Sequence, residues 1–472
     1  MRPPTIAVVG AGISGLAVAY EIRELARRLP QAPRLLCLEA GPRAGGNVRS
    51  ERDGEFLCEW GPNGFLDNVP ATPRLVQRLG LGERMLKSED AAARRFIYRD
   101  GKLRRVPEGA ASFLGSDILP LAGKLRLLGE PFARSKRDGA DESVFQFAAR
   151  RIGTPAAAVM VDAMVSGVYA GDARQLSLPA AFPKMRAMEQ QHGSLFRAML
   201  ARMRRRNGDS GGPAGPGGTL TSFRDGMQEL IDALARVLGD DLRLSHPVEG
   251  VAHMGERGLR VLPREGAPLE VDAVVLANPA RESARLVSTL DPEMSAAMAA
   301  IPSAPLVVMH LGFQTAALGE QPLGFGFLVP RGQGLRMLGS LWSSFIFRER
   351  AAENRRLITV MIGGAHDPGA VELEDRELVA IVRRELQTAM GIHIPPYFTR
   401  IFRHPHGIPQ YNIGHLQRVS TIERSLERYP GLFVSGNSYR GIAINACVDE
   451  APRIAESVVE FLEQRPSAAA GD

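Results

Sequence analysis

The chain opens with two short apolar runs, and each ends where a turn or a charge follows. Residues 5–9 form a run rich in β-branched side chains that leads into three glycines at the spacing GxGxxG. These glycines are Gly10, Gly12 and Gly15. The pattern predicts a buried strand, a tight turn and a helix from Ile13 to about Leu29. A second apolar run at 34–38 ends at Glu39 and predicts another strand of an α/β sheet.

Helical and strand patterns alternate along the rest of the chain. Residues 110–206 are mostly helical in pattern, and an amphipathic helix follows at about 225–239. Four closely spaced apolar runs between 303 and 365 predict a mainly antiparallel sheet. The remaining expected elements are strands near 242–251, 258–263 and 269–277, a charged helix at 374–391, a strand at 431–436 and a last helix.

The glycine turn and the acid that follows it favour a dinucleotide site. Glycines at a strand-to-helix turn let backbone amides approach a pyrophosphate at the helix N-terminus. Glu39 lies 24 residues after the third glycine, near the ~20 residues typical of a carboxylate that binds a ribose hydroxyl. The same acid disfavours NADP because it would repel a 2′-phosphate. An ordinary glycine turn in an α/β sheet is the alternative interpretation of the motif alone.

A second glycine turn and a glycine-rich segment near the end favour FAD over NAD. Arg43, Gly45 and Gly46 follow Glu39 where a guanidinium and bare backbone could reach the same phosphates. Residues 431–445 repeat the strand-and-glycine pattern. We therefore expect a tightly held dinucleotide, and FAD in particular.

Composition restricts the setting of such a protein. The chain has 472 residues, of which 44% are hydrophobic, enough for two or three packed cores. Three widely spaced cysteines, Cys37, Cys58 and Cys447, exclude a disulfide framework and fit a reducing, cytoplasmic compartment. Glycines interrupt the apolar N-terminal run, which argues against a signal peptide, and no apolar run reaches the ~20 residues of a membrane span.

The charge and one apolar pattern bear on binding partners. The net charge is +6 but only 6% of residues are aromatic, so nucleic acid is not expected, and an anionic lipid surface or acidic ligand suits the charge better. Beside Lys124 and Arg126, five apolar residues recur at three- and four-residue spacings. They are Ile118, Leu121, Leu125, Leu128 and Phe132. Such a face normally packs into a core, and docking on a membrane surface is the alternative.

Two local strings suggest other chemistries without the partners that those chemistries need. GDSGGP at 208–213, within a glycine- and proline-rich linker at 207–218, matches the nucleophile string of chymotrypsin-like proteases. The only histidine before it is His192, and the disulfide-bonded all-β context is missing. His404 and His406 flank a proline without an HExxH motif or a carboxylate cluster, so no metal site is expected.

Four further stretches carry a more specific pattern. They are EWGPNGFLD (59–67), SGVYAGDARQLS (166–177), GFGFLVP (324–330) with TVMIGG (359–364), and GIPQYNIGH (407–415). Together with the glycine motif, these stretches resemble the flavoprotein protoporphyrinogen oxidases of the FAD amine-oxidase superfamily. The resemblance spans nearly the whole chain.

The resemblance implies a combined α/β and α+β fold with three domains. A Rossmann-like FAD-binding domain is expected from the separated segments 1–80, 217–285 and 420–472. An antiparallel-sheet substrate domain is expected from 81–110 and 286–419. A mainly helical domain is expected at 111–216, ending in the glycine- and proline-rich loop, with membrane association as its candidate role.

The implied reaction is the oxidation of protoporphyrinogen IX to protoporphyrin IX in porphyrin and heme biosynthesis, with molecular oxygen as acceptor and hydrogen peroxide as product. No catalytic side chain is expected, because flavin N5 accepts the hydride and the protein mainly orients a large apolar macrocycle. A coproporphyrinogen III oxidase of the same family, a flavin amine oxidase and a non-catalytic tetrapyrrole carrier remain as alternatives. The protein is expected to be a cytoplasmic monomer or homodimer, with peripheral contact to the cytoplasmic membrane face as a further expectation.

Six positions match substrate-binding residues of the family. They are Asn63, Arg95, Gly167, Phe325, Leu328 and Met361. The three large apolar residues would sandwich the macrocycle, the glycine would allow close approach, and Arg95 would pair with a propionate. From the pattern alone, Asn63 is equally a turn residue, the apolar residues belong to a core, and Arg95 is an exposed charge on a hairpin that turns at Asp100 and Gly101.

A larger set matches residues that contact the cofactor. They are Gly10, Gly12, Ile13, Ser14, Gly15, Glu39, Ala40, Arg43, Gly45, Gly46, Gly61, Pro62, Asn63, Val248, Gly436, Asn437, Gly441, Ile442, Ala443 and Ile444. Val248 would meet the adenine, and a helix that begins after the last of these residues would direct its positive end at flavin N1 and O2.

The chain departs from the family pattern just beyond this set. Ala446 and Asp449–Pro452 replace the residues that the family commonly has there. Proline is favoured in the first turn of a helix and disfavoured inside it, so the last helix is expected to start late or to bend. The residues around Cys447 do not match those of the covalent amine oxidases, so noncovalent FAD is expected.

Overall fold

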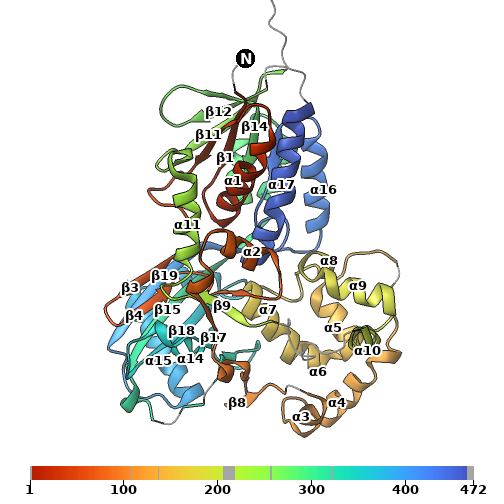
Figure 1. Ribbon diagram of the computed structural model, residues 1–472. Helices are drawn as coiled ribbons and strands as arrows, with labels where there is room; N and C mark the ends of the chain where they lie inside the picture. The colour runs from red at the N-terminus through yellow and green to blue at the C-terminus, as the bar shows by residue number, and fades with distance from the viewer. Residues whose placement is uncertain are drawn as a thin grey trace, which may run out of the picture.

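The computed structural model describes residues 3–107, 109–136, 138–205, 218–255, 258–319, 321–322 and 324–464. It contains an α/β part, a large sheet and a helical part, which occupy three regions of the molecule (Figure 1). The linker predicted at 207–218, with its GDSGGP string, lies outside the described residues except for Gly218.

A five-stranded parallel sheet forms the centre of the α/β part, in the order β10-β2-β1-β14-β20. Its strands are β1 (Thr5–Val9), β2 (Arg34–Leu38), β10 (Leu242–Arg243), β14 (Ala273–Leu276) and β20 (Leu432–Val434). All residues of β1 are buried, as expected for a strand that is covered on both faces. The sheet joins strands from the beginning, the middle and the end of the chain, which confirms a Rossmann-like unit built from separated segments.

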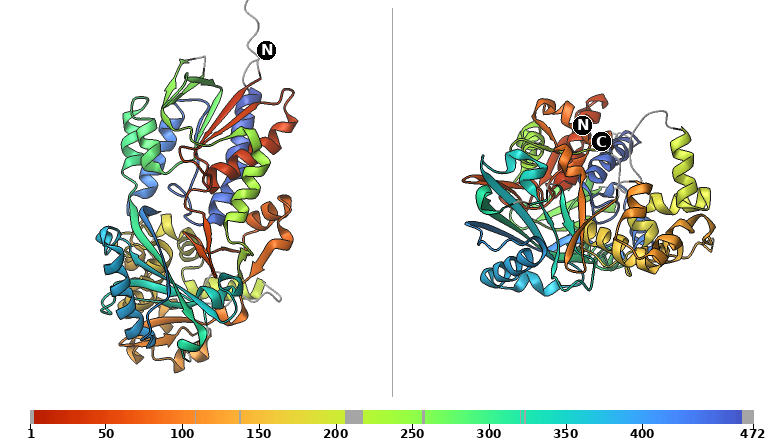
Figure 2. Two further views of the ribbon diagram at one scale, coloured as in Figure 1. Left: turned by 90° about the vertical axis from the view of Figure 1, so that its left-hand side faces the viewer. Right: turned by 90° about the horizontal axis from the view of Figure 1, so that it is seen from below.

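Helices cover both faces of this sheet (Figure 2). One face carries α1 (Ile13–Leu25), α2 (Ala71–Arg78), α11 (Gln228–Leu238) and α17 (Ile444–Gln464). The other face carries α12 (Ala280–Leu286), α13 (Pro292–Ala299), α16 (His415–Leu426) and a small antiparallel sheet of β11 (Val248–His253), β12 (Leu259–Pro263) and β13 (Leu269–Val271). Because α1 packs against α17, the first and last helices hold the glycine turn and the C-terminal glycine loop close together.

A seven-stranded sheet forms the second part, in the order β19-β15-β18-β17-β16-β7-β8. Its strands are β7 (Arg95–Arg99), β8 (Lys102–Arg105), β15 (Ser303–Gln314), β16 (Gly326–Leu328), β17 (Met337–Leu341), β18 (Arg355–Gly363) and β19 (Phe398–Pro409). Every pair is antiparallel except β7 with β16, so the predicted mainly antiparallel sheet is confirmed. The helix α15 (Asp375–Met390) packs on one face, and the hairpin β3 (Ser50–Asp53) and β4 (Phe56–Glu59) packs on the other.

Short elements connect these parts. The strands β5 (Phe65–Leu66), β9 (Leu220–Phe223) and β6 (Met85–Lys87) form a three-stranded sheet in which β9 is central. The short helix α14 (Ser343–Ile346) follows β17. Hairpin β7–β8 turns at Asp100 and Gly101, both with positive φ, as its sequence predicts.

The third part is helical. Its helices are α3 (Ala110–Gly115), α4 (Leu121–Leu128), α5 (Val144–Ile152), α6 (Thr154–Ala156), α7 (Asp162–Tyr169), α8 (Leu178–Ala181), α9 (Pro183–His192) and α10 (Leu195–Arg205), with π-helical residues Ala157–Val161 between α6 and α7. None of the helices within the described residues is both long enough and apolar enough to cross a bilayer.

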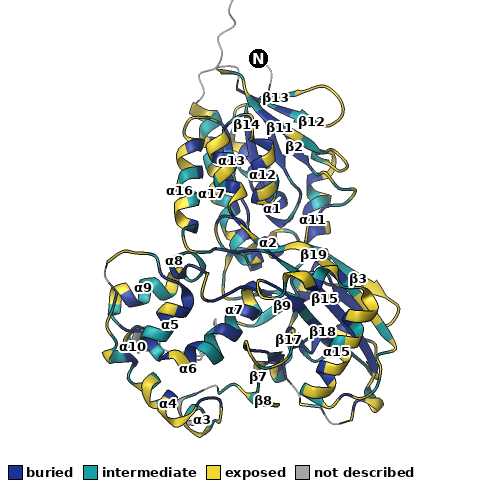
Figure 3. Cartoon of the chain, turned by 180° about the vertical axis from the view of Figure 1, so that it is seen from behind, coloured by how far each residue is buried: buried dark blue, intermediate teal, exposed yellow. Residues whose placement is uncertain are grey.

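The apolar pattern around α4 does not pack inward as its periodicity suggests. Ile118 is fully buried, but Leu121, Leu125 and Phe132 are 72%, 60% and 87% exposed, and Leu128 is exposed as well. Helix α4 buries only Gly123, and Figure 3 shows this end of the helical part largely as exposed surface. The interpretation of these four residues as core is therefore wrong, because α4 packs through Gly123 and Leu127 and turns its other leucines to solvent.

Of the two expectations for the last helix, a late start or a bend, the late start is wrong. Helix α17 begins at Ile444, and Pro452 lies inside it. Proline has no N–H, so the carbonyl one turn earlier, at Val448, receives no helical hydrogen bond from it. The burial of eight of its side chains, Ala451 among them, offsets this loss by packing α17 against α1 and α2.

Candidate functional site

The turn between β1 and α1 has the geometry of an anion-binding turn. Gly10 has φ +102°, and a Cβ added at Gly15 would lie 1.8 Å from the Gly10 carbonyl oxygen, so neither position accepts a side chain without strain. By contrast, a Cβ at Gly12 would meet nothing within 4 Å. Gly12 is the N-cap of α1 and offers no side-chain acceptor. Within the described part of the chain, the first-turn amides at Ile13 and Ser14 have no acceptor and can bind a phosphate.

Glu39 is held directly beside this turn. Its carboxylate accepts hydrogen bonds from the Ala11 amide at 2.8 Å and the Gly41 amide at 2.9 Å. Its backbone carbonyl accepts from the His246 amide at 2.8 Å, which brings the segment that leads to Val248 to the end of β2. Ala40 follows and is exposed. The structure therefore gathers the acid, the glycine turn and the predicted adenine-contacting segment at one sheet edge.

The second glycine turn closes on the first. The Gly45 amide donates to the Ala11 carbonyl at 2.7 Å, and a Cβ at Gly46 would lie 3.4 Å from Gly12 Cα. Arg43 donates to the carbonyls of Ala44 and Gly46 at 3.1 and 2.8 Å, and burial lowers the pKa of its guanidinium. Arg43 therefore lies within the turn, where its remaining donors can still face an anion.

The loop between β20 and α17 meets the same turn from the other end of the chain. Gly436 has φ +124°, and a Cβ there would lie 3.7 Å from the Ser14 hydroxyl. The Glu450 carboxylate accepts from the Gly436 amide at 3.4 Å and from the Ser435 hydroxyl at 3.3 Å. The sequence motifs do not predict this role of Glu450, a residue that departs from the family pattern. Glu450 lies 14 residues after Gly436, and the motifs describe only residues close together in the chain.

The residues that open α17 are tightly placed. A Cβ at Gly441 would lie 2.3 Å from Ala446 Cβ, so the glycine and the small Ala446 fit each other. Asn445 accepts from the Thr72 hydroxyl at 2.7 Å and donates to the Leu66 carbonyl at 2.8 Å. The predicted loop residues Ile442 and Ala443 lie between these fixed points, and Ile442 packs against the helical part. The predicted Asn437 lies earlier in the loop, directly after Gly436.

The predicted Gly61–Pro62–Asn63 segment follows β4. A Cβ at Gly61 would lie 2.6 Å from the Asn47 carbonyl, so this position requires glycine. The carbonyl of Trp60, just before it, contacts His404 Nε2 at 2.8 Å. Asn63 is half-buried, and among the described residues its side chain has no hydrogen-bond partner.

A buried ion pair lies immediately behind this segment. The Glu59 carboxylate accepts from Arg350 at 3.1 Å, the Ser50 hydroxyl at 2.6 Å and the Met227 amide at 3.1 Å. Burial raises the pKa of Glu59 to about 7, although Arg350 acts in the opposite direction. His310 Nε2 contacts the Glu59 carbonyl at 2.8 Å, and burial lowers the pKa of His310 to about 4.

Five of the six predicted substrate residues line one face of the seven-stranded sheet or its margin. Leu328, Gly339 and Met361 lie opposite one another on β16, β17 and β18, so they share a face. Gly167 of α7 approaches this face, because a Cβ there would lie 2.6 Å from Leu328 Cδ2. Gly339 has no predicted role, but its missing side chain leaves room for Leu328, since a Cβ there would lie 3.1 Å from Leu328 Cδ2.

Arg95 lies at the margin of this face. It pairs with Gly326 across β7 and β16, and its guanidinium lies 5.3 Å from the centre of the Phe325 ring. Arg95 is exposed, and no described carboxylate pairs with it. Asn63, the sixth predicted residue, lies on the segment that follows β4, and no hydrogen bond or ion pair between described residues joins it to the sheet face.

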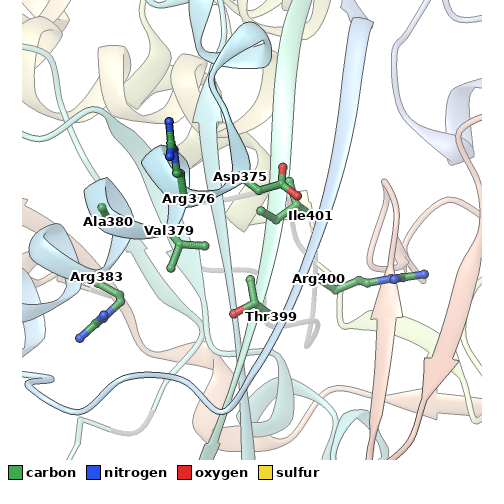
Figure 4. Close-up of a pocket in the computed structure, with 8 residues that line it drawn as sticks. All are labelled: Asp375, Arg376, Val379, Ala380, Arg383, Thr399, Arg400 and Ile401. Atoms are coloured by element: carbon green, nitrogen blue, oxygen red, sulfur yellow. The ribbon is translucent and has the colours of Figure 1, made fainter.

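A separate groove of about 500 Å³ lies between α15 and β19, and Figure 4 shows its three arginines, Arg376, Arg383 and Arg400. It is lined by none of the predicted residues and lies on the sheet face opposite Leu328 and Met361. We therefore build the candidate site on the glycine loops and not on this groove. Among the described residues, no group of three or more His, Cys, Asp and Glu side chains is arranged to hold a metal ion.

The three cysteines are free and buried. Burial raises the pKa of Cys447 to about 11, and the thiol lies near the Ser14 side chain at the start of α1. A neutral buried thiol is a poor nucleophile.

Comparison with known proteins places these loops in a family context. The model of the family described as flavin containing amine oxidoreductase matches residues 13–459. The chloroplastic protoporphyrinogen oxidase of Nicotiana tabacum is 32% identical over 97% of this chain and 86% of its own length. The coproporphyrinogen III oxidase of Bacillus subtilis is 26% identical over 97% and 98% of the two chains. A solved structure from Exiguobacterium sp. 255-15, provisionally named a protoporphyrinogen oxidase, superposes with a TM-score of 0.82 at 26% identity and covers 98% of this chain and all of its own.

Proposed function

The chain belongs to the flavin containing amine oxidoreductases and to their protoporphyrinogen oxidase group, and we propose from this premise that it oxidises protoporphyrinogen IX to protoporphyrin IX. The family makes the protein a flavin-dependent oxidoreductase, which confirms the resemblance inferred from the motifs. The proposed reaction comprises three two-electron oxidations, and each passes two electrons to one molecule of oxygen and yields hydrogen peroxide.

The proposed cofactor is noncovalent FAD. The uncapped start of α1, the open space at Gly12 and the carboxylate of Glu39 fit a pyrophosphate and a ribose, and the loop before α17 supplies bare backbone for the flavin end. Bound FAD supplies the hydride acceptor. The high pKa of the Cys447 thiol supports noncovalent binding, because a covalent link through sulfur needs a reactive thiolate.

One observation carries the substrate proposal, namely the apolar sheet face of Leu328 and Met361 with Arg95 at its margin, which pairs with no carboxylate of the described residues. A flat tetrapyrrole matches an apolar face, and a propionate would give Arg95 the charged partner that it lacks. The role of these residues is to orient the macrocycle and to exclude water from it. No side chain needs to act as acid or base.

The similarity to the Bacillus subtilis enzyme makes coproporphyrinogen III the second candidate substrate. Coproporphyrinogen carries four propionates, whereas protoporphyrinogen carries two. Of the six predicted substrate residues, Arg95 alone is charged, which favours the substrate with fewer carboxylates.

We further propose that the exposed face of α4 docks the enzyme on the cytoplasmic face of a membrane. Leu121, Leu125, Leu128 and Phe132 form an exposed apolar surface on this part of the described chain. Lys124 and Arg126 lie on the same helix, and their charged ends donate to the carbonyls of Leu114 and Arg150. Burial of such a face in the interfacial region of a bilayer is favourable, and anionic lipid adds attraction for the cations.

The test is anaerobic mixing of the FAD-loaded protein with each porphyrinogen, followed by admission of air. Protoporphyrinogen should bleach the flavin absorbance, and air should then produce porphyrin fluorescence with one peroxide per flavin turnover. Faster bleaching by coproporphyrinogen would transfer the assignment to that substrate. A flavin that stays oxidised with both would contradict oxidase activity and favour a tetrapyrrole carrier, and bleaching by amines alone would indicate an amine oxidase.

A further inference from the structure

The motif GIPQYNIGH at 407–415 has no assigned role, but the structure places its second half in a specific position. Residues 410–414 run as a strap along the helical part. The Ser177 amide donates to the Tyr411 carbonyl at 2.8 Å, and the Ile413 amide donates to the Gln175 carbonyl at 2.8 Å. The Gly414 amide donates to the Asp141 carboxylate at 3.0 Å. The strap is thus fixed to the elements that carry the motif at 166–177.

Two side chains, one on the strap and one on the first residue of α16, extend toward the loop that precedes α17. The Tyr411 hydroxyl donates to the Asn437 carbonyl at 2.6 Å, and His415 Nε2 lies 2.9 Å from the Tyr439 carbonyl. A carbonyl can only accept, so Nε2 carries the ring proton. Both side chains are 1% exposed, and their rings stack at 4.1 Å between centroids. His415 Nδ1 has no partner among the described residues, so the bond to Tyr439 is the one polar contact of the ring.

The loop itself needs this support. It contains Gly436 and Gly441, both with positive φ, so its backbone has more freedom than one with side chains throughout. In a trans peptide the carbonyl and the following N–H point in opposite directions. Fixing the carbonyls of Asn437 and Tyr439 therefore also fixes the directions of the N–H groups of Ser438 and Arg440. No described residue accepts a hydrogen bond from either N–H.

We propose that Tyr411 and His415 are positioning residues for the flavin end of the cofactor, acting through the carbonyls of Asn437 and Tyr439. The inference rests on the proposed function, because it assumes that residues 436–444 line the flavin. The two side chains set the loop conformation before the cofactor binds, which lowers the entropy that binding must otherwise remove. The motif at 407–415 then has a physical purpose, namely to join the helical part to the cofactor loop.

The matched control is Tyr169. Its hydroxyl donates to the Ala181 carbonyl at 3.0 Å within the helical part, and its ring packs edge-on against Tyr411 at 6.0 Å. Y411F and Y169F therefore each remove one buried hydroxyl from the same aromatic cluster, but only Y411F releases the cofactor loop. The urea unfolding midpoints of the two apo variants measure their structural costs, which should be similar.

The experiment measures FAD affinity, the visible circular dichroism of bound FAD and its midpoint potential. Y411F should weaken FAD binding about tenfold, the effect of losing one buried hydrogen bond of ~1.4 kcal/mol, and should shift the dichroism and the potential. Y169F should leave all three unchanged. H415L should behave like Y411F, and H415Q, which keeps a donor near Nε2, should recover most of the affinity.

Several results would overturn the proposal. Equal FAD affinity and equal potential in Y411F and Y169F would show that the strap is only structural, and so would the failure of H415Q to improve on H415L. These results are distinct from failure of the proposed function, which shows as an unmodified protein that does not take up FAD or does not oxidise a porphyrinogen. If the protein binds FAD but oxidises no porphyrinogen, the variants still test the role of Tyr411 and His415, because FAD affinity, dichroism and potential are measured without substrate.

Discussion

The replacement of Gly12 by alanine tests the cofactor site independently of any activity. The structure gives this methyl group open space, with no atom within 4 Å, and a backbone φ of −71° that alanine readily adopts. Alanine restricts the unfolded chain, which stabilises the folded protein, but it is a slightly poorer N-cap than glycine, which destabilises it. Each effect is about 0.5–1 kcal/mol, so the two largely cancel. The apo protein should therefore unfold with a free energy within about 0.5 kcal/mol of the original.

The cost of G12A should appear only when FAD binds. The methyl group would occupy the space through which a pyrophosphate approaches the amides at the start of α1. An overpacked site typically loses about 1–3 kcal/mol, which corresponds to roughly 5- to 150-fold weaker FAD binding. Quenching of FAD fluorescence on titration measures the affinity, and urea unfolding of the apo protein measures the stability.

Gly15 provides the contrasting variant. A Cβ there would lie 1.8 Å from the Gly10 carbonyl oxygen and 3.0 Å from its carbonyl carbon, both backbone atoms that can move only if the turn opens. G15A should therefore destabilise the apo protein by at least about 1–3 kcal/mol. The reasoning fails if G12A binds FAD with unchanged affinity, or if the apo forms of G12A and G15A lose the same stability.

Three further predictions concern other parts of the molecule. R95A should raise the KM for the porphyrinogen at least about tenfold, because a charge-assisted hydrogen bond is lost, and should leave FAD affinity unchanged. Steady-state kinetics and FAD titration measure the two quantities. Equal weakening of substrate binding and FAD binding would contradict the assignment. L125S combined with F132S should weaken cosedimentation with anionic vesicles at least about fivefold. The control L416S, on α16, should leave cosedimentation unchanged. Equal effects of the two changes would contradict α4 as the docking face. Folding lowers the pKa of His310 from 6.5 to about 4, so the unfolding free energy should decrease by up to about 3 kcal/mol as the pH falls through this range. The difference in unfolding free energy between the original protein and H310Q should shrink over the same range. A pH-independent difference would show that His310 does not titrate as proposed.

Local patterns in the sequence correctly predict the fold of the segment that carries the first glycine turn and Glu39. Gly10, Gly12, Gly15 and Glu39 lie within one strand–turn–helix–strand unit, where spacing along the chain decides what is close in space. The turn at Gly45 follows the same logic. The mainly antiparallel sheet is also predictable, because strands that follow one another closely in sequence tend to pair.

The remaining features depend on contacts between distant segments. Periodicity shows that α4 is amphipathic, but it cannot tell whether Leu121 and Leu125 face a core or solvent, since that depends on which surface is left uncovered. Local propensity likewise excludes Pro452 from a helix, whereas packing of α17 against α1 and α2 keeps it there. The pairing of Glu59 with Arg350 joins positions far apart in sequence, and a single sequence contains no signal for it.

Three histidines share one arrangement around the predicted flavin loops, and it explains why histidine stands at these positions. Nε2 of His310, His404 and His415 lies 2.8–2.9 Å from the carbonyls of Glu59, Trp60 and Tyr439, respectively. Burial lowers the pKa of all three, so each remains neutral near pH 7 and contributes an N–H without a buried charge. A lysine or arginine would bring a charge that the buried site must neutralise, and a serine is too short to reach across the same gap. Rigid neutral donors thus fix carbonyls in the segment after β4 and in the loop before α17, so these two segments owe part of their shape to histidines that lie behind them.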